Sequence, residues 1–111
     1  MFWHQGNAVI DRDARGWFFG HFAVGERSLN YSSAVELKWS DHSPGDAQVE
    51  WQASKSTSVS ILISGGMDIA FRDGVAKLRR QGDYAHWAPM VEHRWEAILP
   101  SRILTIRWPS K

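Results

Sequence analysis

Apolar residues recur at every second position through much of this chain, and this alternation is the feature that most constrains its fold. Val35, Leu37 and Trp39 alternate with polar residues, and the same pattern runs through 49–53 and 67–71. A period of two places all the apolar side chains on one face of a β-strand, whereas an amphipathic helix needs spacings of three and four. The sequence therefore predicts half-buried strands in these three segments and no helix.

Two further segments, 17–24 and 58–64, are apolar at nearly every position, which is typical of strands covered on both faces. Turn residues separate the expected strands, and the strongest hairpin signal is Asp73-Gly74. Many short strands within 111 residues indicate two sheets that face each other or close into a barrel. We expect the whole chain, 1–111, to form one all-β domain.

Composition excludes several functional classes. The chain has 13 Lys and Arg against 12 Asp and Glu, a net charge of +1, so a protein that binds nucleic acid by its overall charge is not expected. The absence of cysteine excludes disulfides, zinc ribbons, iron–sulfur clusters and thiol nucleophiles. No leader pattern and no apolar run of about 20 residues is found, so we expect a cytoplasmic protein that contacts no membrane.

The segment 82–95 carries a family resemblance. A strand begins at Gly82-Asp83 and ends at a turn containing Pro89, and the next strand has an apolar face that includes His93. This segment resembles the second conserved motif of the cupin superfamily. In that family the matching histidine points into a barrel and binds a metal ion.

The spacing of the first cupin motif fits upstream, and the resemblance then covers 45–107. It is anchored by Gly45 and Gly65, but the family's His, His and Glu between them are replaced by Trp51, Ala53 and Ser58. The resemblance implies a cupin jelly-roll barrel of two antiparallel sheets that keeps one of four metal ligands. Because a catalytic metal usually needs at least three protein ligands, we expect no metal cofactor.

Strand alternation then predicts which side chains enter the barrel. The inward set is Trp51, Val91, His93 and Trp95, and the outward set is Glu50, Gln52, Glu92 and Arg94. An apolar interior with one orienting histidine is typical of a pocket for a small organic ligand. We therefore expect a small-molecule-binding or sensing barrel without catalytic residues, in which the ligand contacts Trp51, Ser58, His86, His93 and Trp95.

Other functions fit the same residues. If the turn centres on Pro89-Met90, His86 faces His93, and a displaced site with a third ligand such as His21 could hold iron, manganese, zinc or nickel. The protein would then be an isomerase, dioxygenase or lyase. A third hypothesis is a structural module whose barrel is filled by tryptophan. A fourth is a carbohydrate-binding sandwich with tryptophans on a polar face.

The resemblance to small single-barrel cupins also implies a partner. It predicts a homodimer in which N-terminal strands extend the sheet of the second copy. The apolar stretch 17–22 gives a physical reason, because an uncovered edge strand of this composition would invite aggregation. We expect a partner chain or the protein's own second sheet to cover it.

Overall fold

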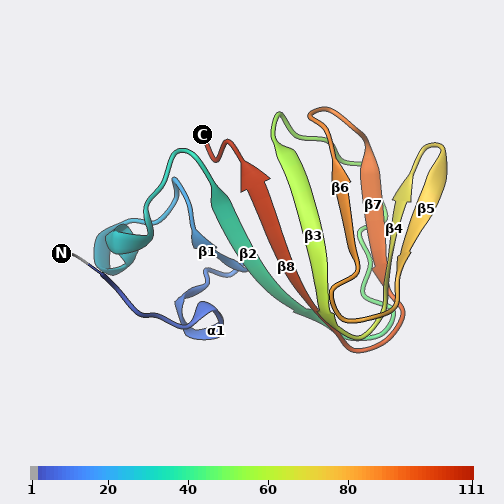
Figure 1. Cartoon of the computed structure of the whole chain (residues 1–111), viewed down its shortest axis with the longest axis horizontal. Coiled ribbons are helices and arrows are strands. Elements are labelled where there is room, and N and C mark those ends of the chain that lie inside the picture. Colours follow the sequence, from blue (N-terminus) through green and yellow to red (C-terminus); the bar gives the residue numbers. More distant parts are fainter. Residues whose placement is uncertain (1–2) are drawn as a thin grey trace.

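The computed structural model describes residues 3–111 and, at positions 26 and 27, the backbone alone. Its regular secondary structure consists mostly of β-strands (Figure 1). The elements in chain order are α1 (Ala8–Asp11), β1 (Trp17–Phe19), the 3-10 helix η1 (Gly25–Asn30), β2 (Glu36–His42), β3 (Thr57–Ser64), β4 (Met67–Phe71), β5 (Gly74–Leu78), β6 (Tyr84–Trp87), β7 (His93–Ala97) and β8 (Ser101–Trp108).

The strands form two antiparallel sheets. The larger has the order β1-β2-β8-β3-β6 and the smaller has the order β5-β4-β7. Strands that are neighbours in the sequence often lie in different sheets, so the chain winds from one sheet to the other (Figure 1). This is the all-β barrel of two facing sheets that the sequence predicts.

The hydrophobic core fills one end of the space between the sheets. Its members at that end are Leu62 and Ile103 from the larger sheet and Met67, Leu78 and Ala97 from the smaller sheet. These residues lie where β3 ends and β4 begins, around the turn that joins the sheets. Toward the start of β3 the inward side chains are Ser58 and Ser60, and there the interior is only partly filled.

The predicted hairpin around Asp73 is confirmed. Strands β4 and β5 pair antiparallel, and Phe71 faces Gly74 across the ladder. The connection therefore consists of Arg72 and Asp73, one position earlier than the Asp73-Gly74 pair suggests.

The strand predicted over 49–53 is wrong. This part of the chain is an irregular extended segment that touches β7 through two isolated bridges, Ala47 to Glu96 and Gln52 to His93. The apolar alternation is present in the sequence, but the segment follows the edge of the smaller sheet without a continuous ladder. Bridge positions, rather than alternation, decide which of its side chains turn inward.

The N-terminal third also departs from the prediction. The strand expected over 17–24 stops at Phe19, and the chain turns at Gly20, whose φ of 144° is a conformation that favours glycine. Two short helices precede and follow β1, and the side chain of Asn7 caps α1 by accepting a hydrogen bond from the Val9 N–H at 2.9 Å. Within residues 3–111, neither helix has the length and apolar character needed to cross a membrane.

Candidate functional site

A cavity of about 280 Å³ lies between the two sheets. Strands of both sheets and the extended segment 47–53 contribute to its wall. Arg15 and Gln52 are the lining residues that are also well exposed, so they form part of its rim. The lining residues are Arg15, Trp17, Lys38, Ser40, His42, Gln48, Gln52, Ser58, Ser60, Met67, Ile69, Trp87, His93, Trp95, Ile103, Thr105 and Arg107.

The wall from the larger sheet is polar. In the ladder, Lys38 of β2 faces Thr105 of β8, which in turn faces Ser60 of β3. One row farther along, Arg107 faces Ser58. Because residues opposite each other on adjacent strands share a face, these two rows form one continuous polar surface.

The opposite wall is apolar and aromatic. Met67 and Ile69 of β4 and Trp95 of β7 line it, and Trp95 pairs with Ile69 in the ladder. Trp87 of β6 lies between the two walls, with its ring centroid 4.5 Å from that of His93. The cavity is therefore amphipathic. Its charged and hydroxyl groups lie mainly on the larger sheet, its aliphatic groups and Trp95 lie mainly on the smaller sheet, and the indoles of Trp17 and Trp87 come from the two outer strands of the larger sheet.

His93 is held in one tautomer. Its Nδ1 lies 3.1 Å from the carbonyl oxygen of Val91, so Nδ1–H donates to that oxygen and Nε2 is left as an acceptor in the neutral ring. Burial lowers the pKa of His93, and Arg107 lowers it further, although the hydrogen bond to Val91 acts in the opposite direction. The imidazole is therefore neutral at pH 7.

His42 is a second neutral imidazole in the cavity wall. Its ring centroid lies 4.3 Å from that of Trp95. Burial lowers the pKa of His42, and the charge of Lys38 adds to this effect, while Asp46 and Asp41 oppose it. Neither histidine contributes positive charge at neutral pH.

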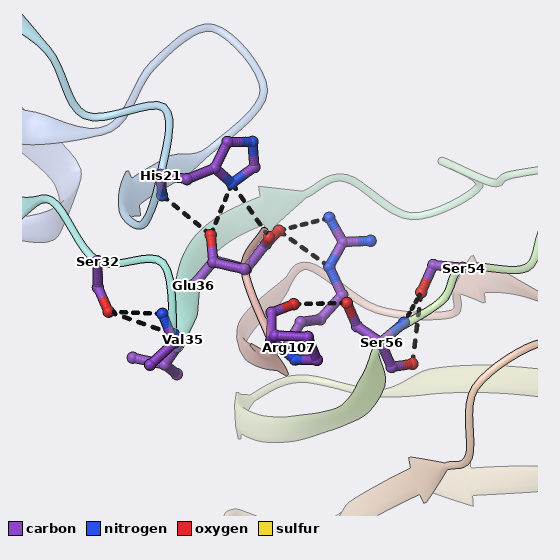
Figure 2. A network of polar contacts seen from close by, with 10 residues as sticks. His21, Ser32, Val35, Glu36, Ser54, Ser56 and Arg107 are labelled. Atoms are coloured by element: carbon purple, nitrogen blue, oxygen red, sulfur yellow. Dashed lines mark hydrogen bonds and ion pairs between the residues drawn. The ribbon is translucent and has the colours of Figure 1, made fainter.

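Glu36 lies on the same face of the larger sheet, opposite Arg107 in the ladder, and neutralises that cation. Figure 2 shows Glu36 between His21 and Arg107. The Glu36 Oε2 accepts hydrogen bonds from Arg107 Nη2 at 2.7 Å and Nε at 3.1 Å, and the residue is 4% exposed. Such a pair places an arginine on the cavity wall without leaving its charge unbalanced.

Two polar atoms on the cavity wall are buried and unpaired. Within residues 3–111, Ser58 Oγ and Trp87 Nε1 have no hydrogen-bond partner, and the two residues are 1% and 8% exposed. They lie opposite each other on β3 and β6. Because nearly all buried polar groups in proteins are hydrogen-bonded, an unpaired pair beside a cavity points to a partner that the chain itself does not supply.

The structure brings together three of the five residues expected at the site. Ser58, His93 and Trp95 all line the cavity, and His93 and Trp95 face inward as predicted. Trp51 does not line it. Its ring lies 4.2 Å from the guanidinium carbon of Arg72 and 4.5 Å from that of Arg94, outside the cavity.

The side chains of the extended segment 47–53 therefore point in the opposite directions to those predicted. Gln52 lines the cavity although it was expected outside, and Gln48 lines it as well. The bridge between Gln52 and His93 sets this orientation. A shift of one residue exchanges the two faces of an extended chain.

The predicted approach of His86 to His93 is wrong. Strand β6 belongs to the larger sheet and β7 to the smaller, so the two histidines are not cross-strand neighbours. His86 pairs with Val59 on β3 and is exposed. Val91 was expected inside the barrel, but it is exposed. Glu92 and Arg94 are exposed, as expected.

Sequence reasoning missed the cationic residues of the wall, Lys38 and Arg107, and the indoles of Trp17 and Trp87. A signal was present in β2 and β3, where polar residues also alternate with a period of two. On these strands the polar set is the one that faces the cavity.

Comparison with solved structures identifies the fold. A cupin-2 domain protein from Shewanella frigidimarina superimposes with a TM-score of 0.58 at 25% identity over 68% of this chain and 71% of that one. The chain has the cupin fold. KdgF from a Halomonas species gives a TM-score of 0.66 at 12% identity, covering 72% and 74% of the two chains. A variant of salicylate 1,2-dioxygenase from Pseudoaminobacter salicylatoxidans gives 0.61 at 12% identity, covering 68% of this chain and 21% of that one.

No family model and no curated protein matches the sequence. The structural neighbours differ in what they are named for, and a shared fold does not fix a function. The function of this chain must therefore be argued from its own cavity.

The residues present do not fit the metal site that cupins hold. Of the four matched positions, Trp51 and Ala53 lie outside the cavity and cannot bind a metal ion, and Ser58 is a weak ligand. That leaves His93. In the part of the chain that the structure describes, no three His, Asp or Glu side chains gather closely enough to hold a metal ion.

Proposed function

We propose that this cupin-fold protein binds a small organic molecule inside its barrel and does so without a metal ion held by its own side chains. The observation that carries the proposal is the pair of buried, unpaired atoms on the cavity wall, Ser58 Oγ and Trp87 Nε1. A bound molecule with hydrogen-bonding groups would satisfy both of them.

The size and walls of the cavity support the same proposal. About 280 Å³ is near the lower limit of ligand pockets, roughly 300 Å³, so the molecule is small. Trp87 and Trp95 offer flat apolar surfaces for its body. A barrel filled by tryptophan, the structural alternative, would not leave this volume open.

The test is a screen of small organic molecules by ligand-observed NMR, with tryptophan fluorescence as a second readout because Trp17, Trp87 and Trp95 line the cavity. Several compounds are expected to bind and to change the emission. Stoichiometric iron, manganese, zinc or nickel that survives dialysis of the purified protein would contradict the metal-free part of the proposal.

A matched pair of serine variants tests the role of Ser58. Ser58→Ala removes an unpaired hydroxyl, so it is expected to weaken ligand binding while leaving stability unchanged or slightly higher. Ser60→Ala, two residues away on β3, removes a hydroxyl already bonded to Thr105 at 2.8 Å, so it is expected to cost about 1 kcal/mol. A barrel that binds nothing in the screen would overturn the proposal.

A further inference from the structure

The charge of the cavity wall restricts the class of ligand. Arg15, Lys38 and Arg107 line the cavity, and no aspartate or glutamate from residues 3–111 does. The two lining histidines are neutral at pH 7, as argued above. The lining is therefore positive although the whole chain has a net charge of only +1.

The three cations are not equivalent. Arg107 is paired with the buried carboxylate of Glu36. Arg15 is exposed at the rim. Lys38 is the partly buried cation whose ammonium group makes no hydrogen bond or ion pair with any side chain that the structure describes.

The Lys38 ammonium group lies beside the ring of Trp17. The indole of Trp17 is 5% exposed, and Lys38 Nζ lies 5.5 Å from its ring centroid. The guanidinium of Arg107 lies 4.3 Å from the same ring. Both cations are thus held against one buried aromatic ring at the polar wall.

From these contacts we infer that the ligand is a small monocarboxylate with a flat apolar body, whose carboxylate pairs with Lys38 while its body packs against Trp87 and Trp95. The inference rests on the proposed function and names its ligand class. Lys38 supplies one partly buried positive charge without a partner, and this matches a ligand with one carboxylate. A second buried carboxylate would have no cation of its own. The apolar wall accounts for the organic body, since a small inorganic anion would leave it exposed to water.

The environment of Lys38 supports this assignment. Burial lowers the pKa of Lys38, and the nearby charges of Arg107 and Arg15 lower it further, while Asp13 opposes them. The free protein therefore holds this ammonium group in an unfavourable place. A bound carboxylate would relieve both the burial and the repulsion.

Two matched pairs of compounds with flat rings test the inference by titration calorimetry: benzoate with benzamide, and thiophene-2-carboxylate with thiophene-2-carboxamide. The members of each pair have nearly the same shape and differ in charge. At pH 7 each acid is expected to bind about tenfold more tightly than its amide, as for a charge-assisted hydrogen bond. Lys38→Met is expected to abolish this preference, and Lys38→Arg to keep part of it.

Lys77→Met is the matched control, because Lys77 is an exposed residue of β5 that does not line the cavity. It is expected to keep the full preference for the acids. A second measurement needs no cavity variant: in protein labelled at the lysine side chains, the acids are expected to shift the Lys38 Cε resonance more than the amides do.

Several outcomes would overturn the inference. The amides could bind as tightly as the acids, or Lys38→Met could keep the preference for the acids. If the screen described above finds only neutral ligands and neither acid binds, the carboxylate class fails while the proposed function stands. If the screen finds no ligand at all, both fail.

Discussion

Glu36 and Asp41 are two carboxylates of β2 that make ion pairs in different surroundings. Glu36 is buried and pairs with Arg107, whereas Asp41 is exposed and pairs with Arg12 and Arg102. A buried charge that loses its partner keeps its desolvation penalty, whereas an exposed one is solvated by water. The two pairs should therefore contribute very differently to stability.

We predict that Glu36→Gln lowers the free energy of unfolding by about 2–3 kcal/mol, because Arg107 is left unbalanced at the cavity wall. Asp41→Asn should cost less than about 1 kcal/mol. Urea denaturation of both variants measures the difference. Glu36→Gln should also tighten benzoate binding, since it frees a second cation, and equal destabilisation by the two variants would contradict this account.

The two cavity histidines make a prediction about pH. The pKa values of His42 and His93 are lowered in the folded protein, chiefly by burial. Between these lowered values and about 6.5, the unfolded chain binds protons that the folded protein does not, so stability falls as the pH drops through this range. Denaturation midpoints from pH 7.5 to 5.5 should decrease, and the His42→Gln/His93→Gln double variant should show a weaker decrease. A midpoint that rises on acidification would contradict the prediction.

At the scale of single elements, alternation predicted which residues share a face but not which face is inward. In β2 the apolar set includes Leu37 and Trp39, yet the cavity is lined by the polar set that begins at Lys38. The reason is physical: a strand face that lines a polar cavity and a strand face that packs into a core have opposite patterns, and one strand viewed alone cannot distinguish them. His93 and Trp95 were placed correctly because their motif supplied the orientation as well as the period.

The turn between β3 and β4 gives a test of close packing at a glycine. Gly65 has a φ of 97°, and a Cβ there would overlap the carbonyl oxygen of Pro100. Gly45 has a similar φ of 89°, but a Cβ there would meet nothing within 4 Å. The two positions separate the cost of an unusual backbone conformation from the cost of a steric clash.

We predict that Gly45→Ala costs about 1 kcal/mol, from backbone conformation alone. Gly65→Ala should cost about 3 kcal/mol or more, because the turn must also move away from Pro100. Thermal or urea denaturation compares the two. Equal losses would show that the clash is relieved without cost.

At the scale of the whole molecule, the N-terminal third extends from one side of the barrel, beyond β2 (Figure 1), and the molecule measures 45 × 28 × 23 Å. The apolar stretch 17–22, expected to need a cover, is largely covered by the chain itself, since Trp17 is buried and its two phenylalanine neighbours in β1 are half-buried. Other apolar side chains of this region are exposed instead. They are Trp3, Val9, Ile10, Val24, Leu29 and Tyr31.

The homodimer implied by the family resemblance remains a prediction, and these exposed side chains give it a location. Val9 and Ile10 of α1 are 49% and 80% exposed, and exposed apolar side chains on a projecting segment are where we expect the dimer interface. Light scattering at micromolar concentration should give twice the mass of one chain. The double variant Val9→Asp/Ile10→Asp should give the mass of one chain and still unfold cooperatively, because neither side chain is part of the core. Its melting temperature should no longer rise with protein concentration, as that of a dimer does. Val75→Asp, at an exposed position on β5 in the smaller sheet, should remain dimeric. A wild-type monomer would refute the dimer, and a double variant that stays dimeric would place the interface elsewhere.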